Sequence, residues 1–246
     1  MAARLLCSVI GPSAVDRLRT VMLPIYDPYR RISYAQEGED LVIDGLLKGK
    51  PIGSYIDVGA HDPIVISNTF RFYRRGWSGL NIDATPGAMR RFALVRPRDI
   101  NVEAAIADHE ESRELHIFNF PGLNTFDAAL AARQDGKPNS GGGTIRVTRR
   151  IPIRTQRLAS ILEQHWAAGR VIDFMSIDVE GLGLAVLRSN DWSRYRPNVI
   201  AIEIHAAPLD SLASVPEVAF LAPLGYRPVA KTATSLFFKP TTGPNS

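Results

Sequence analysis

Acidic side chains follow the short apolar runs of this sequence, close to the point where each run ends. Five of them are Asp57, Asp83, Asp178, Glu180 and Glu203. A carboxylate can bind a positive group or a metal ion, accept hydrogen bonds from hydroxyl groups, or take a proton from a reacting group. One or two acids in such places are ordinary helix caps or turn formers. A repeated series predicts a ligand site.

The apolar runs alternate with helical patterns, which predicts an α/β fold. Strands are expected over 54–58, 79–82, 100–106, 114–119, 146–154, 171–177, 198–204, 226–229 and 235–239. Helices are expected over 68–75, 86–94, 158–165, 182–188 and 215–223. This alternation favours a mostly parallel sheet, in which ligands bind beyond the carboxyl ends of the strands. The last two strands lie too close in sequence for a helical crossover, so the sheet should end in an antiparallel hairpin.

The first strand leads into a segment, 55–63, that reads Tyr-Ile-Asp-Val-Gly-Ala-His-Asp-Pro. Gly59 lets the backbone approach a ligand closely, and Asp83 at the end of the next strand can accept both ribose hydroxyls of an adenosine. These two features suit S-adenosylmethionine or a nicotinamide dinucleotide equally. The second and third glycines that a pyrophosphate needs are absent from the loop, and a terminal hairpin is typical of methyltransferase sheets. Both observations favour S-adenosylmethionine.

The composition places the chain among ordinary globular proteins. Its 246 residues, 45% of them hydrophobic, fit one α/β domain. We expect an N-terminal arm over 1–32, a single domain over 33–240 with a mobile loop at 135–143, and a tail over 241–246. No apolar run approaches the roughly 20 residues of a membrane span. The single cysteine excludes an internal disulfide framework and a cysteine-based zinc site, and a cytoplasmic location is the default expectation.

The net charge of +4 comes from arginines that cluster at several places along the chain. Such clusters indicate solvated faces more often than a basic rim for an anionic substrate or a nucleic acid. Acidic residues are interleaved with the arginines, and the sequence carries no motif of aromatic and basic residues typical of RNA binding. We therefore expect no nucleic-acid partner.

An ordered series of segments resembles the FkbM family of methyltransferases. The series comprises 33–41, 55–63, 67–69, 76–86, 123–126 and the Ser-Ile-Asp-Val-Glu-Gly of 176–181, and the similarity spans roughly residues 33–205. The resemblance implies a class I Rossmann-like fold with a seven-stranded sheet. It also implies transfer of a methyl group from S-adenosylmethionine, usually to a hydroxyl oxygen, and many members act on sugars or secondary metabolites.

Residues at the strand ends are expected to hold the cofactor. Under this assignment, the methionine end lies beside Asp57 and Gly59, the ribose beside Asp83, and the adenine beside Ala84 and Ala105. Ala60 and Asp178 are further cofactor-binding candidates. Two further residues have alternative interpretations. Gln36 either forms a capping box with Ser33 or belongs to a segment folded over the cofactor's amino-acid end. Asn68 is expected to cap the helix after the loop, with Ser67 as the alternative cap and the methionine carboxylate as the alternative partner of Asn68.

Methyl transfer to a hydroxyl requires a base or a metal ion, because the donor is already activated and the acceptor must lose a proton. The candidate bases are His205, Glu180, Asp178 and His61. An alternative is Mg²⁺ bound by Asp178 and Glu203, with Glu180 or His205 as a further ligand.

The sequence thus predicts an O-methyltransferase that acts on a hydroxyl of a saccharide or glycosylated metabolite. Its partner would be a small-molecule or oligosaccharide acceptor, and a homodimer stays open. The rival interpretations are an NAD(P)-dependent oxidoreductase and a catalytically silent Rossmann-like binding module. Carboxylates gathered at the strand ends argue against the silent module, because a scaffold has little use for them.

Overall fold

A seven-stranded sheet forms the centre of the fold in a computed structural model that describes residues 30–139, 141–204 and 208–241. Residues from Ser33 onward belong to one unit. The strands are β1 (Ser54–Val58), β2 (Ser78–Asp83), β3 (Ile100–Glu103), β7 (Phe174–Ile177), β8 (Val199–Glu203), β9 (Tyr226–Lys231) and β10 (Ser235–Pro240). Their spatial order is β3-β2-β1-β7-β8-β10-β9. No helix among the described residues is long and apolar enough to cross a membrane.

The first five strands of this order run parallel, and β10 is antiparallel to both of its neighbours, β8 and β9. Only three residues separate β9 from β10, so these two strands form the expected hairpin. The predicted α/β fold with a mostly parallel seven-stranded sheet and a terminal antiparallel hairpin is confirmed.

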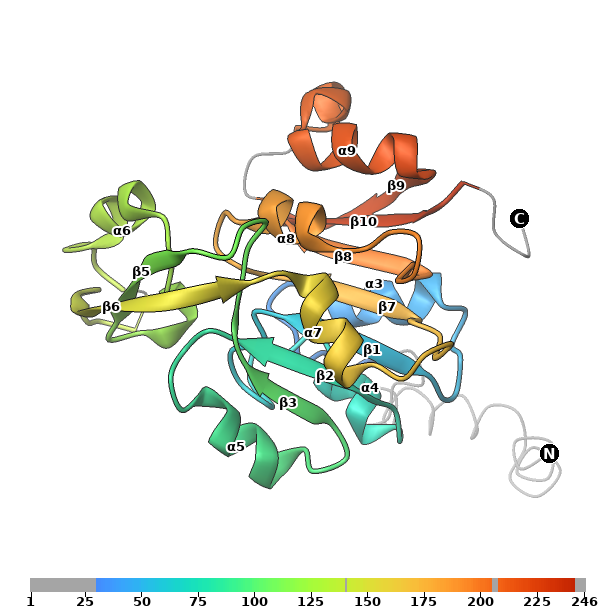
Figure 1. The fold of residues 1–246 in the computed structure, drawn as a ribbon, viewed down its shortest axis with the longest axis horizontal. Helices are drawn as coiled ribbons and strands as arrows, with labels where there is room; N and C mark the ends of the chain where they lie inside the picture. The colour runs from blue at the N-terminus through green and yellow to red at the C-terminus, as the bar shows by residue number, and fades with distance from the viewer. Residues whose placement is uncertain (1–29, 140, 205–207, 242–246) are drawn as a thin grey trace, which may run out of the picture. The chain divides into compact units, whose positions relative to one another are not determined.

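Helices cover both faces of the sheet (Figure 1). On one face α3 (Glu39–Leu46) and α4 (Phe70–Arg74) pack on the large aromatic side chains of the strands, and α5 (Ala88–Val95) contacts β2 and β3. On the other face lie α7 (Leu158–His165), α8 (Gly183–Ser189) and α9 (Pro216–Leu221). Two short 3₁₀ helices, Leu209–Ser214 and Ala222–Leu224, flank α9.

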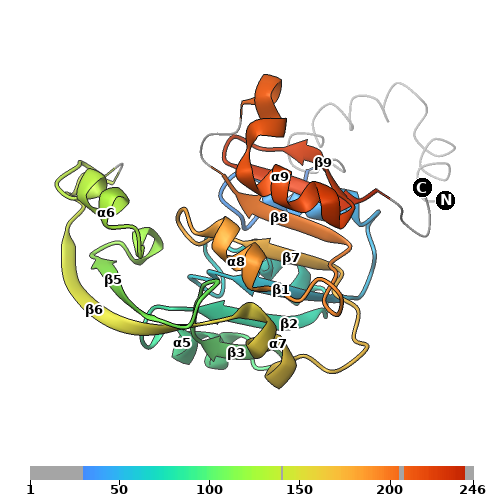
Figure 2. The ribbon, with the colours of Figure 1, turned by 45° about the horizontal axis from the view of Figure 1, so that its top comes forward.

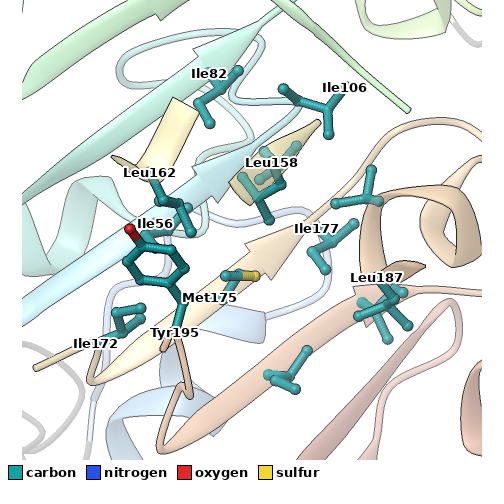
Figure 3. Close-up of a cluster of buried hydrophobic side chains, with 14 of the residues drawn as sticks. Ile56, Ile82, Ile106, Leu158, Leu162, Ile172, Met175, Ile177, Leu187 and Tyr195 are labelled. Atoms are coloured by element: carbon teal, nitrogen blue, oxygen red, sulfur yellow. The ribbon is translucent and has the colours of Figure 1, made fainter. Parts of the chain in front are cut away.

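The central strand β1 shows how the sequence encodes these layers. All five of its residues are buried, as expected for a parallel strand covered on both faces. Because side chains alternate along a strand, Ile56 and Val58 enter the core under α7 and α8, whereas Tyr55 and Asp57 face the opposite side. Figure 3 shows Ile56 among aliphatic side chains of this core, including Leu158 and Leu162 of α7.

A second sheet has three strands, β4 (Ala105–Ile106), β5 (Ser112–Phe118) and β6 (Val147–Gln156), in the order β4-β6-β5. It carries residues 112–156, which we call the arm from here on; the name does not refer to the N-terminal arm expected over 1–32. Between β5 and β6 lie the 3₁₀ helix η1 (Pro121–Leu123) and α6 (Ala128–Gln134). Figures 1 and 2 show the arm beyond the carboxyl end of β2, with β6 bending back toward α7. The arm therefore stands over the sheet edge at which ligands are expected.

Two strands and a capping box differ from the local predictions. The expected strand 100–106 is divided, because Ala104 donates its N–H to the carbonyl of Asp83 and β4 then pairs with β6. The strand expected at 171–177 begins only at Phe174. The capping box of Ser33 and Gln36 is wrong. The Ser33 hydroxyl donates to the Asp40 carboxylate at 2.6 Å, and α3 begins after Gly38, whose left-handed φ of 85° ends the preceding turn.

The loop predicted at 135–143 follows α6, and its described part folds back on itself. The N–H of Asn139 donates to the carbonyl of Gly143, and Pro138 forms an isolated antiparallel bridge with Thr144. Its mobility stays a prediction.

Candidate active site

A cavity of about 480 Å³ lies at the carboxyl ends of the parallel strands, under the arm. This is the position at which open α/β sheets bind ligands, and the volume suits a small organic molecule. Most of the predicted site residues line it: Gln36, Asp57, Gly59, His61, Asn68, Asp83, Ala84, Asp178, Glu180 and Glu203. Residues that lie almost 170 positions apart in sequence therefore share one site.

Three predicted residues are placed elsewhere or not described. Ala60 is buried against Met89 and Phe92, beside the cavity. Ala105 is buried in β4, whereas its neighbours Ala104 and Ile106 line the cavity. The candidate base His205 lies outside the described residues.

Asp83 fixes the shape of the loop that follows β1. Its Oδ2 accepts the N–H of His61 at 2.8 Å, and its Oδ1 accepts the N–H of Thr85 at 2.7 Å. Each carboxylate oxygen has a second acceptor site, so the group can bind hydroxyls while it holds both loops. The N–H groups of Gly59 and Ala60 both donate to the carbonyl of Ile82, which ties the same loop to β2.

Backbone strain is concentrated around the cavity. Four described residues other than glycine have a positive φ, and three of them line it: His61 at 53°, Ile66 at 54° and Glu180 at 47°. A left-handed conformation is unfavourable for a side chain branched at Cβ, such as that of Ile66. Such strain persists where surrounding contacts enforce it and gathers at functional sites.

Asp57 is held from behind by Thr69, the residue before α4. The Thr69 hydroxyl donates to Asp57 Oδ2 at 2.6 Å, and both side chains are buried. Burial raises the pKa of Asp57 to about 6, while the bond from Thr69 and the nearby charge of Arg96 oppose that shift. Asp57 can therefore change its charge close to neutral pH.

Asp178 and Glu203, at the ends of β7 and β8, share a hydrogen bond. Burial raises the pKa of Asp178 well above its usual range, and the neighbouring Glu203 raises it further. Burial likewise raises the pKa of Glu203 to about 7, opposed by the hydrogen bond with Asp178 and reinforced by the charge of Glu180. The pair thus holds a proton near neutral pH. One carboxylate oxygen from each of Asp178, Glu180 and Glu203 also lies within 4.8 Å of the other two, a spacing that a single cation could occupy.

Asn68 faces the cavity and does not cap α4. Its Nδ2 donates to the Ser176 hydroxyl of β7 at 3.0 Å. The Ser67 hydroxyl accepts the N–H of Phe70 at 3.1 Å, but Thr69 is the residue at the N-cap of α4 and no side chain caps the helix, so the expected cap role of Asn68 is wrong. Asn68 is therefore a lining residue of the cavity and not a helix cap.

The arm supplies lining residues that had not been predicted: Leu115, Phe120, Phe126, Gln134 and Asn139. Apolar residues and amides in a hairpin carry no chemical signature of their own. The nearest signal was the segment 123–126. Asn124 donates to the Thr85 hydroxyl at 2.9 Å, and the Thr125 hydroxyl donates to the Glu180 carbonyl at 3.2 Å. These two bonds hold the arm against the ends of β2 and β7.

Several solved methyltransferase structures are similar to this chain at low sequence identity. An O-methyltransferase from Bacillus cereus, in complex with SAH, is 11% identical, with 96% of this chain and 95% of that chain covered and a TM-score of 0.42. The METTL16 methyltransferase domain is also 11% identical, with 92% and 78% covered and a TM-score of 0.44. A SAM-dependent methyltransferase from Geobacter sulfurreducens, in complex with S-adenosyl-L-homocysteine, is 12% identical, with 87% and 72% covered and a TM-score of 0.37.

A comparison with curated proteins finds no match. The sequence pattern of the methyltransferase FkbM domain, however, matches residues 57–228. This range runs from Asp57 at the cavity, through the arm and the Asp178–Glu203 pair, to the first strand of the terminal hairpin, and it covers well over half of the chain. The chain, with its methyltransferase sheet and its acidic cavity at the strand ends, belongs to the FkbM methyltransferase family.

Proposed function

We propose that this protein transfers the methyl group of S-adenosylmethionine to a hydroxyl oxygen of a saccharide or glycosylated metabolite. The observation that carries the proposal is the set of five carboxyl groups that line the cavity: Asp57, Asp83, Asp178, Glu180 and Glu203. S-adenosylmethionine brings a sulfonium and an ammonium group, which carboxylates attract. A nicotinamide dinucleotide would bring a negatively charged diphosphate to the same acids, so the oxidoreductase alternative fits less well.

The cofactor is proposed to lie across the ends of β1 and β2. Asp83 accepts the ribose hydroxyls with the acceptor sites that its two backbone bonds leave free. Ala84 with Ala104 and Ile106 provides the apolar surface for the adenine. Asp57 and Gly59 are assigned to the methionine end, and Gln36 and Asn68, which also line the cavity, are assigned to the polar groups of that end.

The Asp178–Glu203 pair is the proposed base. The acceptor oxygen attacks the methyl carbon, the carbon–sulfur bond breaks, its electron pair stays on the sulfur, and the hydroxyl proton passes to the pair. Because the pKa of Glu203 is about 7, its carboxylate is present near neutral pH and still a useful proton acceptor. Glu180, a predicted base, lies beside the pair, and His61 lies on the cofactor loop next to Gly122 of the arm.

A Mg²⁺ ion at Asp178, Glu180 and Glu203 is the alternative, favoured by the mutual approach of their oxygens. Carboxylate oxygens are suitable ligands for Mg²⁺, and the ion would lower the pKa of the acceptor hydroxyl. Full activity in EDTA supports the base. If EDTA abolishes the activity and Mg²⁺ restores it, the ion and not the base assists the loss of the hydroxyl proton.

The arm is proposed to bind the acceptor. Phe120 and Phe126 offer flat apolar faces of the kind that stack on sugar rings, and the amides of Gln134 and Asn139 can both donate to and accept from hydroxyls. The direct test is incubation of the purified protein with methyl-labelled S-adenosylmethionine and fractionated cell extract, followed by mass spectrometry of the labelled product. A methyl ether on a glycan-containing product is expected. Tight cofactor binding without transfer to any fraction would support the silent binding module.

A further inference from the structure

Arg96, just after α5, is a charged residue in the interior of the protein. Its side chain is fully buried and forms an ion pair with Asp99, with 2.8 Å between Nε and Oδ2. Its Nη2 also donates to the hydroxyl of Tyr55 at 2.7 Å. A buried guanidinium is costly unless its donors are paired, and here the Asp99 carboxylate and the Tyr55 hydroxyl accept from it.

The hydroxyl of Thr69 connects the Arg96 guanidinium to Asp57, which lines the cavity. Arg96 Nη2 donates to Thr69 Oγ1 at 3.0 Å, and Thr69 Oγ1 donates to Asp57 Oδ2 at 2.6 Å. A hydroxyl has a single proton, so an oxygen that accepts from Arg96 is free to donate that proton to Asp57. The order of donors is therefore fixed from Arg96 through Thr69 to the carboxylate at the cavity. Arg96, Thr69 and Asp57 are all buried, so water does not screen this chain of contacts.

We propose that Arg96 is a positioning residue for the cofactor, which acts through the Thr69 hydroxyl to keep Asp57 ionised and turned toward the methionine end of the site. This inference rests on the proposed function, in which Asp57 meets the ammonium group of S-adenosylmethionine. A protonated Asp57 would lose most of its attraction for that ammonium group.

The charges around Asp57 show why such a residue is needed. Asp83, at the end of β2, and Asp99, after α5, both raise the pKa of Asp57, as does burial. Asp178, at the end of β7, is close enough to interact with it electrostatically. Arg96 is the cation that faces Asp57 from the described elements packed against it, and it lowers the pKa together with the Thr69 hydroxyl. Removal of the hydroxyl should therefore move the ionisation of Asp57 further into the neutral range.

The test compares Thr69→Val with Thr69→Ser. Valine keeps the shape of threonine but removes the hydroxyl, whereas serine keeps the hydroxyl. The affinity of the full chain for S-adenosylhomocysteine, which carries the same amino-acid end, is measured by titration calorimetry from pH 5.5 to 8.5. A shift of one unit in the pKa of Asp57 changes its ionised fraction about tenfold below that pKa. Thr69→Val should therefore bind about tenfold more weakly than the wild type at pH 5.5 and about equally at pH 8.5. Thr69→Ser should follow the wild type.

A merely structural role for Thr69 predicts a different result, a loss of affinity by the same factor at every pH. That outcome, or a valine variant with the wild-type pH profile, overturns the proposal. Thermal unfolding shows whether the variants are folded. If Thr69→Val is not, Arg96→Lys replaces it, because lysine keeps the charge beside Asp99 but cannot reach Thr69 as well, and the same pH-dependent loss is expected. A wild-type chain that does not bind S-adenosylhomocysteine at any pH refutes the proposed function itself, and the positioning role with it.

Discussion

The carbonyl oxygen of Asp178 occupies the space in which a side chain at Gly59 would begin. A Cβ added to Gly59 would lie 1.6 Å from that oxygen, and the residue has a φ of 82°. The loop after β1 and the end of β7 can therefore meet only where one of them has no side chain. The expectation that Gly59 frees space for a ligand is thus incomplete, because the protein's own backbone uses that space.

This contact predicts the effect of Gly59→Ala. The clash and the left-handed conformation together should lower the free energy of unfolding by about 3 kcal/mol or more. Gly136→Ala is the matched control, because Gly136 has a nearly equal φ of 84° and nothing within 4 Å of an added Cβ. It should cost only about 1 kcal/mol. Urea unfolding of both variants measures the difference, and equal losses would contradict the importance of the contact.

Asp83→Ala should remove cofactor binding while the chain stays folded. The ribose loses its acceptor, and the N–H groups of His61 and Thr85 lose theirs, which should also lower stability by about 1–3 kcal/mol. Asp127→Ala is the control, since Asp127 likewise accepts two backbone N–H groups, those of Ala129 and Leu130, at the start of α6. Titration with S-adenosylhomocysteine should show binding to Asp127→Ala but not to Asp83→Ala. Unchanged affinity in Asp83→Ala would refute the ribose role.

Glu203→Gln should lower kcat about 10²- to 10⁴-fold, the range typical of a lost general base. In the wild type the rate should rise with pH through about 7, where Glu203 loses its proton, and this dependence should disappear in the variant. The affinity for S-adenosylhomocysteine should change little. Glu163→Gln, which removes a surface partner of Arg194, is the control and should behave as the wild type. A variant with normal kcat would exclude Glu203 from proton transfer.

Asp57→Asn should become more stable relative to the wild type as the pH rises. The pKa of Asp57 is raised from 3.8 to about 6 in the folded protein, so the unfolded chain ionises first. The contribution of the neutral carboxyl to stability is complete below pH 4 and is lost as the pH rises through 6. Asparagine does not ionise, so the difference in the free energy of unfolding should grow by up to about 3 kcal/mol between pH 4 and pH 8. Denaturant titrations at both pH values test this, and a constant difference would contradict it.

The sheet could be predicted well because its signals are local. The strand at 54–58 and the helix at 158–165 were predicted with the bounds that the structure shows, since each is an apolar or amphipathic segment with clear ends. Helix α3 was missed because it starts after a glycine in a left-handed turn, without a capping side chain. The break between β3 and β4 has no local signal, because it arises from the pairing of β4 with the distant β6.

The candidate site could be predicted on its sheet side only. The acids of β1, β2, β7 and β8 come together because the carboxyl ends of parallel strands meet at one edge. Gln134 and Asn139 reach the cavity only through the fold of the arm, which depends on the pairing of β5 with β6 and on contacts such as that of Asn124 with Thr85. The arrangement of long hairpins relative to a sheet is a tertiary property that residue types do not reveal.

The most direct test of the central claim is the thermal stability of the full chain with S-adenosylhomocysteine, compared with NADH and NADPH under the same conditions. A ligand that binds only the folded state raises Tm in proportion to the logarithm of its concentration over Kd. We expect S-adenosylhomocysteine to raise Tm by several degrees and both nicotinamide cofactors to leave it unchanged. A rise in Tm with NADH or NADPH but not with S-adenosylhomocysteine would contradict the assignment of the cavity to S-adenosylmethionine.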